Sequence, residues 1–198
     1  MRRGRWIGIA MIAALVVIAA ALLLISRAPA LSSVEVSSQP CIASGDACLR
    51  FPTISGDNLP GEVFNLPEDF VGERNLVIVP FDEAQQVNAA GWLPLAQELA
   101  AAHPDFAYYS LPIFPAMAAP LRAIIRTGMN FTITDADLRA LTITTFLDDR
   151  DVFLAALDIP NTDAMQVFLL DADGAVIWRG EGAFDEAQGE ALRAAVSG

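Results

Sequence analysis

The hydrophobic pattern of this chain is made of apolar runs without polar alternation, separated by stretches with helical periodicity. Asn75 to Phe81 is short, apolar and rich in β-branched residues. Such a run is typical of a strand buried on both faces of an α/β sheet, and we expect it to be the central strand. A helix is predicted from about Glu83 to Ala102, with an apolar face carrying Val87, Leu95 and Leu99.

The rest of the pattern predicts further alternation of strands and helices. Residues 112–141 interrupt it as an insert with an apolar helical segment. The other expected strands are Phe106 to Leu111, Thr142 to Leu147, Met165 to Leu170 and Ala175 to Arg179. The other expected helices run from Asp149 or Arg150 to Leu157 and from Asp185 to Val196. We therefore expect an α/β domain over 51–198, with a central mixed sheet flanked by helices.

The N-terminus predicts a membrane anchor over residues 1–27. Trp6 to Ile25 holds 20 consecutive uncharged, mostly apolar residues. A helix of that length is about 30 Å long, enough to cross a bilayer core. Arg2, Arg3 and Arg5 precede it, so the positive-inside rule keeps the N-terminus cytoplasmic. The expected location is the bacterial inner membrane, single-pass, with the C-terminal domain in the periplasm. A cleaved signal peptide is the alternative, because Ala28-Pro29-Ala30 is a small-residue pattern that a signal peptidase accepts.

Charge excludes one class of partner. All 24 acidic residues follow Arg27, and the chain has no lysine. Eight arginines against these 24 acids give the exported part a formal charge of −16. Binding to nucleic acid depends on basic residues that neutralise phosphates, so no nucleic-acid partner is expected. Solubility is a sufficient explanation of the acidity, and a basic protein partner is the more specific one.

The two cysteines, Cys41 and Cys48, lie in a spacer of residues 28–50 that is rich in Ser, Ala and Pro. In an oxidising compartment the simplest reading is a disulfide that closes a short loop, which stabilises the fold by about 2.5 kcal/mol on the chain-entropy model. The alternative is a redox-active pair. Six intervening residues do not provide the constrained geometry of a Cys-x-x-Cys motif.

Several motifs resemble the thioredoxin-like superfamily, particularly its peroxiredoxin-type and membrane-anchored thiol-oxidoreductase members. They are Phe51-Pro52-x-x-x-Gly56, Phe70-x-Gly72, the strand ending at Phe81, and an Asp171-x-Asp-Gly174 turn followed by a Trp-bearing strand and a final helix. The resemblance covers roughly residues 51–196, interrupted by the insert. It implies a thioredoxin-like fold.

The reactive residues of that superfamily are absent from the expected positions. Members commonly carry a proline in the helix, five residues after the second active-site cysteine. Counting back from Pro94 places the two cysteine positions on Gln86 and Ala89, and residues 81–92 contain no cysteine. The enzymes also place a cis-proline just before the strand that corresponds to Met165 to Leu170, where this chain has Asp163-Ala164. The resemblance therefore implies the scaffold without its redox chemistry.

Metal and hydrolytic chemistry find little support. His103 is the only histidine, too few for a His-based metal site, and its place before Pro104 suggests a helix C-terminal cap. No Gly-x-Ser-x-Gly motif is present. Asp171 to Gly174 resembles the start of a calcium loop, but Gly182 stands where a bidentate acid is needed, so it reads as a turn. No cofactor and no metal is expected.

Two surfaces are candidates for binding. The first, here called the polar rim, comprises Asp82, Glu83, Gln85, Gln86 and Trp92. The alternative for Asp82 and Glu83 is a purely structural role at the helix N-terminus. The second is an insert interface of Met117, Leu121, Arg122, Ile125 and Arg126, which would dock a membrane protein or the bilayer surface through apolar residues and arginines. Its alternative is core packing or a lid.

The favoured hypothesis is a redox-inactive, membrane-tethered thioredoxin-like protein that binds rather than catalyses. It would act as an assembly factor or chaperone for a membrane complex. The run Leu-Val-Ile-Val-x-Phe, Gln85-Gln86, Trp92-Leu-Pro94 and the insert after the second strand are similar to thioredoxin-like ATP-synthase assembly factors. The alternative is a periplasmic thiol-disulfide oxidoreductase that uses Cys41 and Cys48.

Overall fold

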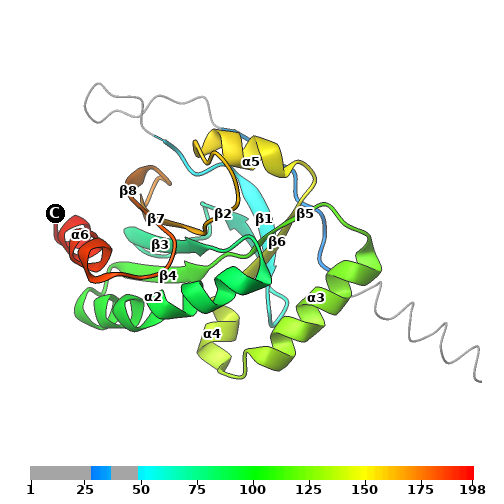
Figure 1. The fold of residues 1–198 in the computed structure, drawn as a ribbon, viewed down its shortest axis with the longest axis horizontal. Helices are drawn as coiled ribbons and strands as arrows, with labels where there is room; N and C mark the ends of the chain where they lie inside the picture. The colour runs from blue at the N-terminus through cyan, green and yellow to red at the C-terminus, as the bar shows by residue number, and fades with distance from the viewer. Residues whose placement is uncertain (1–27, 37–48) are drawn as a thin grey trace, which may run out of the picture.

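A computed structural model describes residues 28–36 and 49–198 (Figure 1). The predicted anchor and both cysteines, Cys41 and Cys48, lie outside these ranges. Among the helices of the described ranges, none combines the length and the apolar character needed to cross a bilayer. The predicted anchor and disulfide stay predictions.

One sheet contains the predicted central strand. Its order is β4 (Phe106–Ser110), β3 (Arg74–Val79), β7 (Gln166–Asp171) and β8 (Val176–Glu181). β3 is parallel to β4 and antiparallel to β7, and β8 is antiparallel to β7. Residues 75–79 of β3 are all buried, which confirms the expected central position.

The strand ends at Val79 because the next residue, Pro80, has no amide hydrogen for a ladder bond. The Pro80 carbonyl still accepts a hydrogen bond from the Ile113 amide, with 3.0 Å between the two atoms. The chain beyond β4 is thereby held against the end of β3.

A second sheet has the order β2 (Val63–Leu66), β1 (Ile54–Asn58), β6 (Ile143–Leu147) and β5 (Ile113–Pro115). The expected mixed central sheet is present, and this second sheet, which was not predicted, accompanies it. The chain leaves β4 and, after Leu111-Pro112, pairs in parallel with β6 as β5. Residues Ile113–Pro115 of the predicted insert thus belong to a sheet.

Two helices cover one face of the first sheet. They are α2 (Glu83–Ala102), whose bounds match the prediction, and α6 (Glu186–Ser197). Their apolar side chains form one core with alternate residues of β3 and β7: Leu76, Ile78, Trp92, Leu95, Leu99, Val167, Leu169, Leu192 and Val196. Burial of this kind is the main stabilising term for such a layer.

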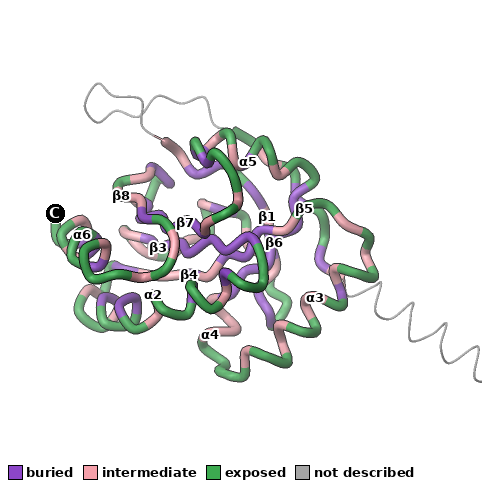
Figure 2. The backbone as a smooth tube through the Cα atoms, viewed as in Figure 1, coloured by how far each residue is buried: buried purple, intermediate pink, exposed green. Residues whose placement is uncertain are grey.

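The opposite face of the first sheet packs against the second sheet and α5 (Arg150–Ala156). This core joins Val77 and Val79 of β3 to Ile54, Phe153, Leu157, Phe168 and Leu170. Figure 2 shows buried residues concentrated along the strands between the helices. The central sheet is therefore buried on both faces, as the unbroken apolar runs predicted.

The insert forms α3 (Ala119–Thr132) and α4 (Ala136–Ala140) after β5. Ala123 is the one buried residue of α3, and α4 has none. In Figure 1 the two helices lie at the edge of the domain, with α4 between α3 and α2. The insert thus adds an outer element next to the N-terminal half of α2.

The turn between β7 and β8 confirms the Asp-x-Asp-Gly prediction. The Asp171 side chain accepts hydrogen bonds from the amides of Asp173 and Ala175 at 3.0 and 2.8 Å. Gly174 has φ of +78°, a conformation that side chains disfavour. A tight turn accounts for these residues without a bound ion.

Candidate functional site

The N-terminus of α2 is capped as its acidic residues predicted. Asp82 is the N-cap, and its side chain accepts a hydrogen bond from the Gln85 amide at 2.9 Å. Glu83 follows in the first turn, where a negative charge suits the helix dipole. At the other end the amide of His103, the C-cap, donates to the Leu99 carbonyl at 2.8 Å. The structural reading of Asp82 and Glu83 is sufficient, and both side chains remain exposed.

Gln85 is not part of an exposed rim. Its side chain is buried, Oε1 accepts a hydrogen bond from the Phe81 amide at 2.9 Å, and Nε2 donates to the Thr162 carbonyl at 2.8 Å. The amide joins the start of α2 to the loop that precedes β7. In the resembled enzymes these two segments carry the cysteines and the cis-proline, so a structural cross-link now occupies the region between them.

Trp92 is also absent from the surface, which corrects its assignment to the polar rim. It is fully buried, and its indole Nε1 donates to the Gly182 carbonyl at 3.0 Å. The ring packs edge-on against Phe184 and Trp178, with centroids 5.3 and 6.1 Å away. Trp92 therefore anchors α2 to the β8–α6 end of the domain.

The buried face of α2 agrees with the prediction at Leu95 and Leu99 and differs from it at Val87. Gln85, Ala89, Trp92 and Leu99 point inward, and Val87 lies on the opposite side of the helix with 76% of its surface exposed. The spacing of three and four residues between the buried positions could have revealed this phase from the sequence. Val87 lies outside this spacing, so the sequence could have placed it on the exposed side, next to the positions 86 and 89 that correspond to the superfamily's cysteines.

Two adjoining hollows lie between α2 and the insert. The first has a volume of about 510 Å³ and the second about 440 Å³. Both are lined by Gln86, Thr132 and Ile133, so we call them together the α2–insert groove. Further lining residues are Val87, Ala90, Leu93, Tyr108 and Leu138 in the first hollow, and Glu83, Phe114, Ile125 and Met129 in the second.

This groove is mostly apolar and has acidic residues at its edge. Glu83 lines the second hollow and Asp135 the first. Within the described ranges no group of three potential metal ligands was found among His, Cys, Asp and Glu. The arrangement is suited to holding an apolar segment, because apolar walls with few polar groups are what most binding clefts present.

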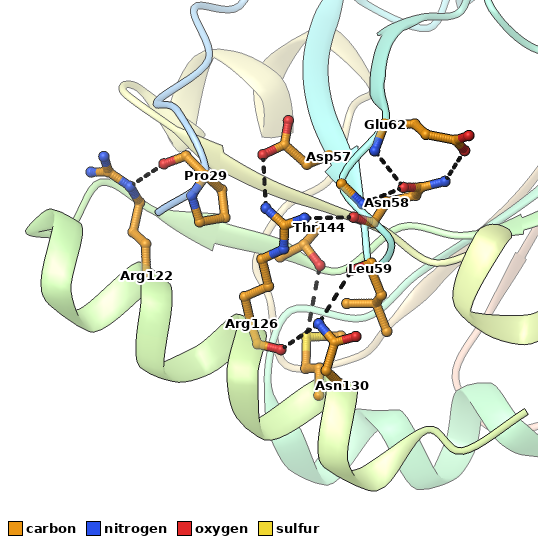
Figure 3. A network of polar contacts seen from close by, with 11 residues as sticks. Pro29, Asp57, Asn58, Leu59, Glu62, Arg122, Arg126, Asn130 and Thr144 are labelled. Carbon is orange, nitrogen blue, oxygen red and sulfur yellow. Dashed lines mark hydrogen bonds and ion pairs between the residues drawn. The ribbon is translucent and has the colours of Figure 1, made fainter. Parts of the chain in front are cut away.

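The two arginines of the predicted insert interface point inward, which corrects their role (Figure 3). Arg122 donates from Nε to the Pro29 carbonyl and from Nη1 to the Met117 carbonyl, both at 2.6 Å. Arg126 donates to Asp57 Oδ2 and to the Asn58 carbonyl, both at 3.3 Å. Both guanidinium groups therefore have partners within the chain: Arg126 holds α3 to β1, and Arg122 holds α3 to the described part of the spacer.

The Arg126 and Asp57 side chains are each 17% exposed. Burial raises the pKa of the Asp57 carboxyl, and the nearby Arg126 charge lowers it by less, so the pKa lies above its usual 3.8. Desolvation disfavours the charged form, and the ion pair offsets only part of that cost. The contact positions α3 more than it stabilises the fold.

The apolar members of the insert interface divide into two groups. Leu121 is exposed, as predicted for a docking residue, while Ile125 is half-buried and lines the second hollow. Met117 is half-buried and offers its carbonyl to Arg122. The structure thus brings Ile125 together with Gln86 in the groove and leaves Leu121 on the outer side of α3.

Comparisons with known proteins give similarity in structure only. No family model matches the chain, and no curated protein matches its sequence. A putative electron transfer protein from Aquifex aeolicus VF5 is similar with a TM-score of 0.51 and 15% identity, over 75% of this chain and 94% of that one.

Two other similar structures carry names from the resembled superfamily. The thioredoxin domain of a thiol-disulfide oxidoreductase from Bacteroides vulgatus has a TM-score of 0.46 and 17% identity, over 79% of this chain and 99% of that one. BsSco, a member of the Sco family of cytochrome c oxidase assembly proteins, has a TM-score of 0.49 and 12% identity, over 78% and 97%. The expected thioredoxin-like fold is confirmed, and identities this low concern the fold alone.

Proposed function

Starting from this thioredoxin-like fold, we propose that the protein is a redox-inactive, membrane-tethered binding protein that acts as an assembly factor or chaperone for a membrane complex. Its α2–insert groove holds an apolar segment of a partner subunit. The tether is the apolar run from Trp6 to Ile25, and the domain faces the periplasm.

This proposal rests on the start of α2, where polar and apolar side chains stand at the positions that carry reactive cysteines in the resembled enzymes. The segment from Phe81 to Trp92, which includes the N-terminal half of α2, contains no sulfur, and the buried Gln85 amide joins this segment to the loop before β7. The neighbouring surface, in contrast, is hollowed and apolar. A site that lacks a nucleophile and offers an apolar cleft is suited to binding.

The expected occupant is an apolar protein segment with basic residues beside it. Val87 and Leu138 give apolar contact area in the first hollow. Glu83 and Asp135 stand at the edges of the groove, in a domain whose formal charge is strongly negative. Complementary charge would guide such a segment and fix its register, while the apolar contact would supply most of the affinity.

Crosslinking and capture from membranes test this proposal with two matched variants. Val87 and Val71 are both highly exposed, at 76% and 85%, and only Val87 lines the groove. Val87→Asp should reduce capture of the partner, because a carboxylate in an apolar cleft must be desolvated. Val71→Asp should leave capture unchanged. Equal capture by both variants would contradict the assignment of the groove.

The oxidoreductase alternative is tested separately through Cys41 and Cys48. A double Cys→Ser variant should capture the partner as well as the unmodified protein does, apart from any loss of stability. Insulin reduction or peroxide consumption should not rise above background. Turnover that disappears in the double variant would overturn the redox-inactive assignment.

A further inference from the structure

We infer that the outer face of α3 lies in the interfacial region of the lipid bilayer, with the helix axis parallel to the membrane. This inference rests on the proposed membrane tether. It concerns a different surface from the α2–insert groove, since the residues that carry it point away from the domain.

The first observation is that α3 is amphipathic in the inverse sense to an ordinary surface helix. A helix of a globular domain turns its apolar stripe to the core and its polar side to water. In α3 the inward side carries Arg122, Arg126 and Asn130, which bond to Pro29, to Asp57 and to the Leu59 carbonyl (Figure 3). Polar contacts, together with the one buried residue Ala123, hold this helix to the domain.

The outward side of α3 is apolar. Leu121, Ile124 and Phe131 are 48%, 62% and 87% exposed, and Gly128 has open space around it. The positions 121, 124, 128 and 131 follow each other at spacings of three and four residues, so they share one stripe along the helix. At 1.5 Å per residue the 14-residue helix is about 20 Å long, and the stripe runs along most of it.

The second observation is the charge of this region. The chain has 24 acidic residues, but none lies between Asp105 and Asp135. Among the helices in the described residues, α3 is the one without a carboxylate, and its charged residues are Arg122 and Arg126. A surface that approaches anionic headgroups must avoid carboxylates, and this stretch does so within a strongly acidic domain.

The third observation is the position of α3 relative to the tether. Arg122 binds the carbonyl of Pro29, which is four residues after Ile25, the last residue of the apolar run. Four residues span at most about 14 Å even when fully extended. The N-terminal end of α3 must therefore lie close to the point where a tether formed by that run leaves the bilayer.

A protein could in principle cover the same stripe. The nearness to the end of the anchor and the lack of carboxylates favour lipid, because both are requirements of a membrane surface and neither is needed by a protein partner. An aromatic residue and two aliphatic residues on one side are the composition of helices that sit about 5–10 Å into the headgroup boundary. The α2–insert groove, bordered by the same helix, would then open near the membrane.

The test uses the full chain in vesicles of phosphatidylethanolamine and phosphatidylglycerol. Flotation with the vesicles first establishes the tether. Phe131→Trp, in a Trp6→Phe background, then reports contact through quenching by phospholipids with brominated acyl chains. Val71→Trp in the same background is the control, because Val71 is equally exposed and lies outside α3. Circular dichroism checks that both variants fold.

The Trp6→Phe protein retains Trp92 and Trp178, so its emission is subtracted from that of each variant. We expect the emission added by Phe131→Trp to lie at shorter wavelength and to be lost on quenching, and the emission added by Val71→Trp to be unaffected. Flotation without quenching at position 131 would overturn the inference and leave the proposed tether intact. Loss of flotation would overturn the tether and this inference with it. A photo-crosslink from position 131 to a protein instead of lipid, in native membranes, would also overturn it.

Discussion

Gln85 in α2 donates a hydrogen bond from Nε2 to the carbonyl of Thr162 at 2.8 Å, and so joins two segments that are 77 residues apart. Its Oε1 also accepts from the Phe81 amide. The neighbouring residue, Gln86, is half-buried and lines both hollows of the groove. Two identical side chains in succession therefore have different tasks, because a rotation of about 100° per residue turns one inward and the other toward the groove.

This contrast gives the first prediction. Gln85→Ala leaves the Phe81 amide and the Thr162 carbonyl without their partner, and an unsatisfied buried polar group costs about 1–3 kcal/mol. Gln86→Ala should change the free energy of unfolding by less than about 0.5 kcal/mol, as surface substitutions usually do. Chemical denaturation of the two variants measures the difference. Equal stabilities would show that the Gln85 cross-link is unimportant.

The regular elements were predictable because their determinants are local. The apolar run around Val77 and the caps Asp82 and His103 fix β3 and α2, and their signals lie within a few residues of each boundary. The turn at Gly174 is equally local. These elements follow the pattern closely.

The arrangement around the insert was not predictable in the same way. β5 has three residues and ends in Pro115, so it shows no alternation that could be recognised. Arg122 and Arg126 find partners at Pro29 and Asp57, far away in the sequence, and helical periodicity cannot reveal those contacts. The sequence therefore predicted an apolar, arginine-bearing helix correctly but gave its arginines the wrong direction.

Gly56 lies where β1 closely approaches β6, and it gives the second prediction. A Cβ at this position would stand 2.9 Å from Ile143 Cγ2 and 3.0 Å from the Thr144 carbonyl oxygen, and closer still to Thr145 Oγ1. Because a backbone atom is among the neighbours, the strands must shift. Gly56→Ala should destabilise the fold by about 1–3 kcal/mol, as overpacking of a core does. Thermal unfolding of the variant measures this cost.

Gly91 provides the control for that substitution. It is exposed in α2, and a Cβ there would meet only Phe184 Cβ at an ordinary 3.7 Å. Gly91→Ala should stabilise the protein by about 0.5–1 kcal/mol, because alanine favours the helix over the unfolded chain. The two Gly→Ala changes should therefore shift the melting temperature in opposite directions. A shift of both in the same direction would contradict the close approach at Gly56.

The third prediction concerns Trp92. Trp92→Phe keeps an aromatic ring but removes the indole donor to the Gly182 carbonyl and leaves a small void. We expect a loss of about 1–3 kcal/mol, since the indole hydrogen bond is lost and a fully buried side chain becomes smaller. Trp178→Phe, at a partly exposed position of β8, should cost less. A larger effect at Trp178 in denaturation experiments would contradict the anchoring role of Trp92.

The fourth prediction is a dependence of stability on pH with opposite signs at Asp57 and Asp185. Burial raises the pKa of Asp57 above 3.8 in the folded state. Between 3.8 and that raised pKa the folded state binds more protons than the unfolded state, so the free energy of unfolding falls as pH rises through this range. Asp57→Asn lacks this titration. The stability of Asp57→Asn relative to the unmodified protein should therefore increase with pH above 3.8.

Asp185, the N-cap of α6, should behave in the opposite way and serves as the matched control. Hydrogen bonds from the Gln188 amide and side chain lower the pKa of its carboxyl below 3.8. Its stabilising contribution is present above 3.8 and is lost as pH falls toward the lowered pKa, because the unfolded state then binds more protons. The stability of Asp185→Asn relative to the unmodified protein should thus decrease as pH rises toward 3.8. Denaturation of the three proteins across these ranges measures both slopes, and two slopes of the same sign would show that burial does not dominate at Asp57.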